Sequence, residues 1–296
     1  MAVPLLRHEF ETTSSLADAF RVDSISELRE DHVFEVLNFL GERPLHTVFM
    51  ASLIRDNGLV SPQNRGSFYA CRNAHGSLEG VALLGHATVI EARTSASISA
   101  FARMARNCRN AHLIRGDRDT MTRFWNEYAN LGEEPQRVCS EFLLKLEGDL
   151  PAVEPVDLRQ AALEDLNNVL PINASMALEE GGVSPLQRDP SGFRQRTTRR
   201  IIQGRVWVWV RDDRLIFKAD VVGNTPQVTY LEGIYVNPEE RRKGYGLRGL
   251  TQLSSILMTS SQAICLTVNE QNEKAAAMYE KAGYRLHSHY ETIYLS

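Results

Sequence analysis

The sequence predicts an α/β protein built from two domains. Three observations predict this: a length of 296 residues, a composition with 43% hydrophobic and 24% charged residues, and strand and helix patterns that alternate along both halves of the chain. A chain of this length is too long for one average domain, and each half is long enough to bury its own core. The composition argues against intrinsic disorder and against fibrous proteins.

Charge and cysteine content argue against several classes of function. The net charge of -4 lacks the basic excess that neutralising many phosphates requires, so we expect no nucleic acid partner. The four cysteines show neither the close pairs of a zinc site nor the density of a disulfide scaffold. We expect them to be reduced and mostly buried, with no metal bound. They are Cys71, Cys108, Cys139 and Cys265.

Two features of the chain favour a cytoplasmic protein without a membrane partner. Residues Met1 to Phe10 show no charged leader followed by an apolar core. No apolar run in the sequence approaches the length needed to cross a bilayer. A cytoplasmic location is the default expectation from these observations.

The first half of the chain is expected to begin with two helices. Apolar residues at helical spacing predict helices at Ser26–Leu40 and Leu45–Arg55, and Asn57-Gly58 suits a left-handed cap after the second one. The patterns that follow predict strands at Ser67–Cys71 and Gly80–Ile90, a helix at Ser97–Arg106, a strand at Ala111–Arg115, a helix at Thr120–Asn130 and a strand at Val138–Leu146.

A linker separates the two predicted domains. Glu147–Val156 contains Gly148, Pro151 and Pro155, a composition that cannot continue a helix or a central strand. We therefore assign residues 1–150 to the first domain and residues 151–296 to the second.

The second half is expected to end with the same order of elements as the first. Its patterns predict helices at Leu163–Leu170 and Phe193–Ile202, strands at Val206–Val210, Leu215–Val222 and Gln227–Val236, a helix at Leu247–Ser260, a strand at Ala263–Val268, a helix at Glu273–Ala282 and a closing strand region at Tyr284–Leu295. Both halves thus end β, α, β, α, β. Because this order is common in α/β domains and the halves share no motif, an internal duplication stays open.

The most informative stretch is Tyr230–Gly249, which reads as a strand, a basic loop with glycines and then a helix. Glycines let the backbone approach a ligand closely, and the free amides at a helix N-terminus attract a diphosphate. Three cations, Arg241, Arg242 and Lys243, stand at the same place. The loop therefore predicts a site for a phosphorylated cofactor.

Two other interpretations of this loop have to be weighed. Gly244, Gly246 and Gly249 spell G-x-G-x-x-G, and Glu270 lies at a distance suited to a ribose-binding acid, as in dinucleotide-binding folds. That fingerprint should start where the strand ends, however, whereas Asn237–Lys243 intervenes here. A glycine-rich turn before a helix is also common as a purely structural feature.

A second motif favours the cofactor site and carries a resemblance to a known family. Arg241-x-x-Gly244-x-Gly246 resembles the coenzyme A pyrophosphate loop of the GNAT superfamily of N-acetyltransferases. Asn272-x-x-Ala275-x-x-x-Tyr279-x-x-x-Gly283-Tyr284 resembles the next motif of that family. The resemblance covers about Val156–Ser296, and the first half lacks such a loop.

The resemblance implies two tandem GNAT-like domains, each a mixed, mostly antiparallel sheet flanked by helices. The first domain would be a degenerate acetyltransferase-like domain that has lost its cofactor site. The second would bind acetyl-CoA as co-substrate and transfer its acetyl group to a primary amine by direct attack on the thioester. The strand backbone at Ile234, Tyr235 and Val236 would pair with the pantetheine arm. The remaining expected cofactor contacts are Arg241, Arg242, Lys243, Gly244, Tyr245, Gly246, Leu247 and Asn272.

Two residues are candidates for catalysis. Glu232, on the strand beside the expected thioester, is the candidate base, directly or through a water, because a half-buried carboxylate can have a raised pKa. Alternatively, Glu232 faces solvent or pairs with an arginine while water takes the proton. By the family resemblance, Tyr279 is the general acid for the leaving thiolate; the alternative is an aromatic of the core.

Several further residues keep more than one interpretation. Asn272 is a plain helix cap, a cofactor contact or both. His287 and His289 receive no ligand role, because no partner at metal spacing accompanies them. The arginines of Phe193–Gln203 are expected either to be solvated or to attract an acidic acceptor.

The acceptor, a small amine or a protein, cannot be identified from the sequence, and the acyl group is not fixed by the loop. The alternative from another class of function is a non-catalytic acyl-CoA binding or sensing protein. Such a protein would keep the loop without needing Glu232 or Tyr279.

Overall fold

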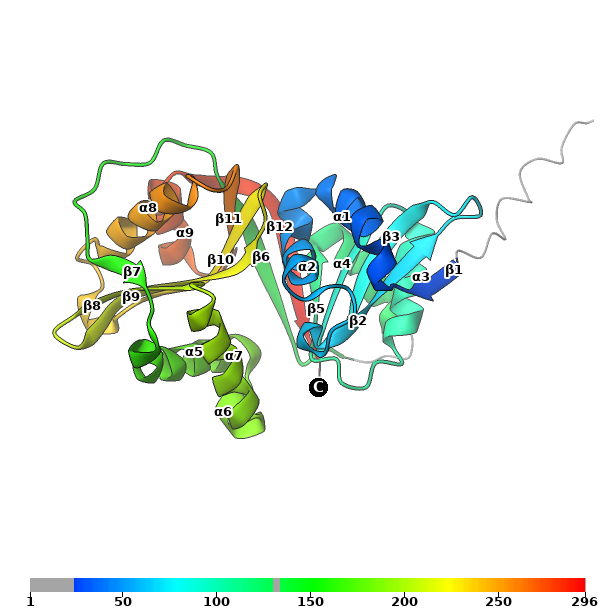
Figure 1. Ribbon diagram of the computed structural model, residues 1–296, viewed down its shortest axis with the longest axis horizontal. Coiled ribbons are helices and arrows are strands. Elements are labelled where there is room, and N and C mark those ends of the chain that lie inside the picture. The colour runs from blue at the N-terminus through cyan, green and yellow to red at the C-terminus, as the bar shows by residue number, and fades with distance from the viewer. Residues whose placement is uncertain (1–23, 130–133, 296) are drawn as a thin grey trace, which may run out of the picture.

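One mixed sheet runs through the whole protein. The computed structural model describes residues 24–129 and 134–295, and within them twelve strands form a single sheet of order β1-β2-β3-β4-β5-β12-β6-β11-β10-β9-β8-β7 (Figure 1). Two neighbouring pairs, β4 with β5 and β10 with β11, are parallel, and the other pairs are antiparallel. The sheet is mostly antiparallel, as the predicted fold class requires.

The N-terminal half follows the predicted order with two corrections. Its elements are β1 (Ser24–Glu27), α1 (Val33–Gly41), α2 (Pro44–Asn57), β2 (Gly66–Arg72), β3 (Leu78–Gly85), β4 (Ala87–Ala92), α3 (Ser95–Ala105), β5 (Leu113–Asp117), α4 (Arg118–Tyr128) and β6 (Arg137–Leu146). The prediction of a helix from Ser26 was wrong, because residues 24–27 pair with β2. Two sequence expectations concern residues outside the described ones: the lack of a leader at Met1–Phe10, and the end of the helix predicted at Thr120–Asn130.

The single strand predicted at Gly80–Ile90 is a hairpin of β3 and β4. The chain reverses around Gly85, where Leu83 of β3 pairs with Val89 of β4. A Cβ atom at Gly85 would lie 2.2 Å from the carbonyl oxygen of Arg65, so this turn needs a glycine. The apolar run continues through both strands, and its periodicity alone does not mark the turn.

The C-terminal half contains the predicted elements and two more. Its elements are β7 (Leu158–Gln160), α5 (Leu166–Gly181), α6 (Pro185–Arg188), α7 (Pro190–Ile202), β8 (Val206–Arg211), β9 (Arg214–Asn224), β10 (Val228–Val236), α8 (Tyr245–Leu257), β11 (Ala263–Asn269), α9 (Glu273–Lys281) and β12 (Tyr284–Tyr294). The sequence did not predict β7 or α6, and α5 continues eleven residues beyond the predicted end at Leu170, with Pro171 inside it.

The two halves exchange their last strands. The C-terminal strand β12 pairs with β5 of the N-terminal half, and β6 pairs with β11 of the C-terminal half, so both exchanged strands lie side by side in the middle of the sheet. The segment between β6 and β7 carries no helix or strand, in line with the predicted linker. The division at residue 150 stays a prediction.

Helices cover both faces of the C-terminal part of the sheet. Leu250 and Leu253 of α8 and Tyr279 of α9 pack in one core with residues of β9, β10 and β11. A separate core is formed by residues of α5, α7 and β8, including Val169 and Ile201. Helices α8 and α9 therefore lie on one side of the sheet and α5 to α7 on the other, with β10 between them (Figure 1).

Candidate functional site

Strand β10 stops pairing with β11 in the middle of the sheet. The pairing ends with Leu231 opposite Leu266, although β10 continues to Val236 and β11 to Asn269. From Glu232 onward β10 therefore has a free edge on this side. Such an edge offers backbone donors and acceptors to an extended ligand.

A bulge lies on the same stretch of β10. Glu232 pairs with Asp220 and Tyr235 with Lys218, so Gly233 and Ile234 together oppose one residue of β9. Gly233 has a φ of 59°, and its carbonyl oxygen accepts a hydrogen bond of 3.0 Å from Nζ of the buried Lys218. A bulge leaves one backbone amide outside the ladder, where it can donate to another group.

The loop after β10 leads to the open N-terminus of α8. Gly244 occupies the N-cap position with a φ of 79°, and no side chain caps the helix there. The amides of the first turn are therefore available to an anion, and the positive end of the helix dipole favours one. Within the described part of the chain, Arg241 and Arg242 form no ion pair, while Lys243 Nζ lies 2.8 Å from Glu240 Oε2.

Gly246 and Gly249 are required by close packing of α8. A Cβ atom at Gly249 would lie 2.8 Å from the ring of Phe217, and one at Gly246 would lie 2.6 Å from Met278 Sδ. These glycines let α8 approach the sheet closely. Together with the mostly antiparallel sheet, this disfavours the dinucleotide interpretation, which requires a parallel doubly wound sheet.

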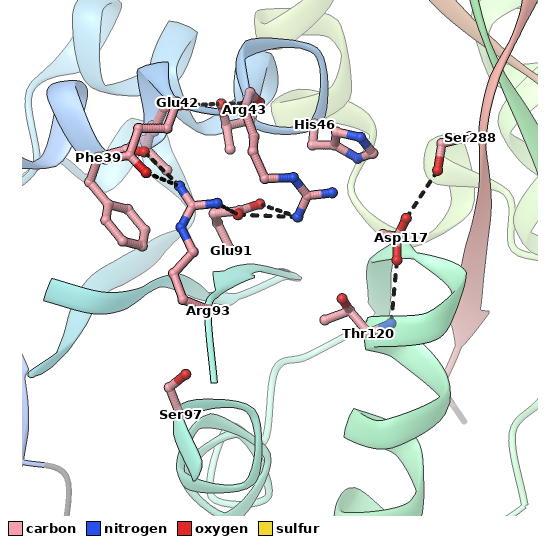
Figure 2. A network of polar contacts seen from close by, with 12 residues as sticks. Phe39, Glu42, Arg43, His46, Glu91, Arg93, Ser97, Asp117, Thr120 and Ser288 are labelled. Atoms are coloured by element: carbon pink, nitrogen blue, oxygen red, sulfur yellow. Dashed lines mark hydrogen bonds and ion pairs between the residues drawn. The ribbon is translucent and has the colours of Figure 1, made fainter. Parts of the chain in front are cut away.

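The corresponding place in the N-terminal half is closed by side chains. Strands β4 and β5 stop pairing after Val89, and Glu91 beyond that point is 3% exposed. Figure 2 shows Glu91 held between Arg93, with Nη1 2.8 Å from Oε1, and Arg43, with Nη1 3.2 Å from the same oxygen.

Helix α3, which follows β4 as α8 follows β10, is capped at its own N-terminus. The side chain of Thr94 accepts a hydrogen bond of 3.2 Å from the Ser97 amide. This half thus offers neither the open helix end nor the basic loop of the C-terminal half.

Glu232 is held by an arginine of the other half of the chain. Arg115 Nη1 of β5 lies 2.6 Å from Glu232 Oε1, and Arg115 Nη2 donates to Thr267 Oγ1 at 2.6 Å and to the Tyr230 hydroxyl at 2.7 Å. The Tyr230 hydroxyl also donates to Glu232. Burial alone would raise the pKa of Glu232, but the charge of Arg115 and these hydrogen bonds hold it below its ordinary value.

This finding corrects one part of the sequence analysis. The sequence led us to expect a raised pKa for Glu232, whereas the pKa is lowered. The pairing with an arginine is the alternative that the sequence left open for this residue. The side chain remains 37% exposed, so the ionised carboxylate keeps contact with water.

A second carboxylate, Glu180 at the end of α5, interacts electrostatically with Glu232 and Arg115. Its pKa is raised to about 7, first by desolvation and then by the negative charge of Glu232, against the opposing charge of Arg115, although the residue as a whole is exposed at the surface. Its charge also contributes to the raised pKa of Tyr279, after burial. The charge of Glu180 is therefore coupled to Glu232 and Arg115, and it affects Tyr279 as well. A carboxylate with a pKa near 7 is suited to accepting a proton at neutral pH.

Tyr279 lies on α9 and Asn272 lies directly before this helix, as predicted from the sequence. The Asn272 Oδ1 atom accepts a hydrogen bond of 3.2 Å from the Ala275 amide and caps the helix. Tyr279 is buried, its ring packs edge-on against Tyr284 at 6.3 Å, and its raised pKa keeps the hydroxyl protonated.

Other candidate residues have structural partners. Glu270 binds Arg118 and His289 instead of facing the glycine loop. On α7, Arg196 pairs with Asp189 at 3.0 Å, and Arg199 donates to Asn57 at 2.7 Å. These contacts explain much of the charge on α7 without an acidic acceptor.

No group of three or more His, Cys, Asp or Glu side chains among residues 24–129 and 134–295 is arranged to hold a metal ion. In the same residues, no helix combines the length and apolar character that crossing a membrane requires.

Sequence reasoning missed Arg115, Glu180 and Tyr230. Tyr230 stands two residues before Glu232 on the strand already singled out, so alternation along the strand places both side chains on one face and was a usable signal. Arg115 lies 117 residues from Glu232 in sequence, and no local pattern marks it.

Comparisons with known proteins bear on this geometry. Residues 222–293 match the model of the FR47-like protein family. No curated protein matches the chain.

Solved structures resemble the protein over almost its whole length. A tandem GNAT protein from the clavulanic acid biosynthesis pathway is 15% identical, with a TM-score of 0.56, over 91% of this chain and 97% of that one. A GCN5-related N-acetyltransferase from Sphaerobacter thermophilus is 11% identical, with a TM-score of 0.58, over 91% and 94%. A Drosophila protein is 15% identical, with a TM-score of 0.64, over 93% and 99%. At these identities the likeness is one of fold.

Proposed function

Because the chain has the two-domain fold of GNAT proteins and its residues 222–293 match the FR47-like family, we propose that it is an acetyl-CoA-dependent N-acetyltransferase. In this proposal it transfers the acetyl group to a primary amine. The observation that carries the proposal is the open N-terminus of α8, which follows a basic loop at the end of the free edge of β10.

Acetyl-CoA would lie along this edge. The backbone of Ile234, Tyr235 and Val236 pairs with the pantetheine arm as an added strand does. The amides from Arg242 to Leu247 hold the pyrophosphate. The guanidinium groups of Arg241 and Arg242, which form no ion pair among the described residues, lie beside it, and Arg241 Nε donates to the Val236 carbonyl at 3.2 Å. Support comes from the absence of a side-chain cap at Gly244 and from the left-handed φ of 66° at Arg242.

The amine must lose its proton before it attacks. An alkyl amine with a pKa of about 10.4 is neutral in only about one part in a thousand near pH 7. Glu232, ionised beside Arg115, attracts the ammonium and is the base proposed from the sequence, directly or through a water. Glu180, whose pKa is about 7, is a second proton acceptor on the same cluster.

The transfer itself then follows in two steps. The amine nitrogen attacks the thioester carbon, and an amide of the β10 bulge near Ile234 donates to the oxyanion. The carbon–sulfur bond breaks, and the leaving thiolate of coenzyme A takes the proton of the Tyr279 hydroxyl. The nitrogen loses a second proton as the amide forms, and Tyr279 recovers its proton from this one or from the solvent.

Calorimetric titration with acetyl-CoA tests the cofactor site. We expect one-site binding that Arg241→Ala weakens about tenfold and that Arg123→Ala, a change of an exposed arginine on α4, leaves unchanged. NADH serves as the control ligand and should not bind. Tight binding of NADH, or no binding of acetyl-CoA, would contradict the proposal.

Catalysis is tested by the release of free coenzyme A in the presence of a panel of primary amines. Release that depends on an amine supports the transferase and identifies the class of acceptor. Binding of acetyl-CoA without release by any amine would favour a non-catalytic acyl-CoA sensor. Faster release of coenzyme A from longer acyl-CoA thioesters would show that the protein is an acyltransferase whose preferred donor is not acetyl-CoA.

A further inference from the structure

A hollow of about 390 Å³ lies away from the glycine loop, where the N-terminal half meets the connection between α5 and α6. Four separate parts of the chain form its wall: the two residues just before β5, the residue just before β6, Leu295 after β12, and the α5–α6 region. The lining residues are Ala111, His112, Gln136, Val183, Arg188 and Leu295. Its size is in the range of small-molecule sites.

Two polar side chains in this wall, Arg188 and His112, contact each other. Arg188 Nη1 lies 3.2 Å from His112 Nδ1. Because a guanidinium group has donors only, His112 Nδ1 accepts this bond and the ring proton sits on Nε2. The His112 ring stacks on His86, with centroids 5.2 Å apart and an angle of 23° between the planes.

Positive charge around the hollow is poorly compensated. Within residues 24–129 and 134–295, neither Arg65 nor Arg188 forms an ion pair, whereas Arg196 nearby is paired with Asp189 at 3.0 Å. Burial and then the charge of Arg65 lower the pKa of His86 to about 3, and burial followed by the charge of Arg188 lowers the pKa of His112. Both histidines are therefore neutral near pH 7, and the arginines supply the positive potential.

We propose that this hollow binds an oxyanion, the carboxylate or phosphate group of a small ligand, through Arg188 and His112. The planar donors of an arginine match the two oxygens of either group, and a neutral imidazole adds one N–H donor. Gln136 contributes a side-chain amide to the wall, and Val183 and Leu295 provide apolar surface for the rest of the ligand. Binding of an oxyanion in this hollow does not require acetyl transfer at the glycine loop.

Binding at this place would connect the two halves of the chain. His112 belongs to the N-terminal half, and Arg188 is the last residue of α6 in the C-terminal half. A ligand that bridges them binds only the folded protein, so it raises the thermal unfolding midpoint as its concentration rises above its dissociation constant.

The test is a calorimetric titration of the full chain with inorganic phosphate and, separately, with succinate at constant ionic strength. We expect one-site binding of at least one of these anions, and the stronger of the two identifies the preferred oxyanion. Arg188→Gln should weaken it at least tenfold. Arg194→Gln, which removes an exposed arginine of α7, is the matched control and should leave the affinity unchanged.

Phosphate can also bind the glycine loop, and Arg241→Ala separates the two places. Binding that Arg241→Ala weakens and Arg188→Gln does not belongs to the loop and overturns the proposal. Absence of binding of both anions overturns it as well. Unfolding midpoints measured without ligand show whether Arg188→Gln folds normally, and His112→Gln, expected to weaken binding severalfold, provides a second variant for the same comparison.

Discussion

Arg115 Nη1 lies 2.6 Å from Glu232 Oε1, although the two residues are 117 positions apart in the sequence and belong to different halves of the chain. The exchange of β6 and β12 between the halves places β5 and β10 on either side of these two strands and β11. In the N-terminal half, α3, which corresponds to α8, is capped at its N-terminus, yet this half supplies the cation that keeps the candidate base ionised.

Replacing Arg115 by methionine should raise the pKa of Glu232, because burial then acts without the opposing charge. In the wild type the folded-state pKa of Glu232 is lowered. The pair therefore stabilises the fold above the unfolded pKa of about 4.3, and this contribution is lost as pH falls through the folded-state pKa. Urea unfolding at pH 7 should show a loss of about 2 kcal/mol, modest because Glu232 is 37% exposed.

The loss should shrink at a pH near 3, where Glu232 is protonated in the variant and increasingly so in the wild type. Arg123→Met is the control for a change of an exposed arginine. Equal losses at both pH values would show that Arg115 contributes packing and not charge pairing.

Replacing Glu232 by glutamine should lower the pKa of Glu180. The negative charge of Glu232 helps to raise that pKa to about 7, after burial. Carboxyl carbon NMR follows this pKa without requiring activity. If Glu180 accepts the proton, the rate of acetyl transfer rises with pH through about 7 in the wild type, and Glu180→Gln loses this limb.

Glu179→Gln, a change of the neighbouring glutamate, which is exposed as Glu180 is, serves as control. An unchanged pH profile in Glu180→Gln would remove Glu180 from the proton transfer. It would leave Glu232 or a water as the acceptor.

The order of a strand, a basic loop with glycines and a helix at Tyr230–Gly249 could be predicted from the sequence because its determinants are local, whereas the binding of a cofactor there stays a prediction. The basic residues, the glycines and the helix that follows occupy one continuous stretch, and Asn272 and Tyr279 share a second motif. The exchange of β6 and β12 could not be predicted, because the periodicity of a strand gives its buried face and not its neighbour. Arg115 and Glu180 were missed for the same reason: only the pairing of distant strands and the packing of α5 bring them to Glu232.

Gly249→Ala should destabilise the protein by about 1–3 kcal/mol. The added Cβ atom would lie 2.8 Å from the ring of Phe217, which is fully buried and has no room to move. Urea unfolding measures the loss, and Ser255→Ala on the exposed side of α8 is the control. Wild-type stability of Gly249→Ala would mean that α8 packs less closely on β9 than the structure indicates.

Asn272→Ala should cost about 1 kcal/mol of stability, because the Ala275 amide loses its capping partner. Asn272→Ser, which can also cap, should restore most of it. Titration with acetyl-CoA then separates the two roles. If Asn272 is only a cap, the serine variant binds acetyl-CoA as the wild type does; if it contacts the cofactor, the serine variant regains stability but not affinity.

Tyr279→Phe should reduce the rate of acetyl transfer about a hundredfold while leaving the affinity for acetyl-CoA unchanged, as expected for a general acid that acts only when the thiolate leaves. Burial and the charge of Glu180 raise the pKa of Tyr279, so its hydroxyl stays protonated throughout the neutral range. The ring packs against Tyr284, and phenylalanine keeps that contact. Tyr284→Phe is the matched control: its hydroxyl lies 2.8 Å from Ser254 Oγ inside the core, so it should lower stability without lowering the rate. Equal loss of rate in both variants would show that Tyr279 is only a core residue. Water would then supply the proton to the thiolate.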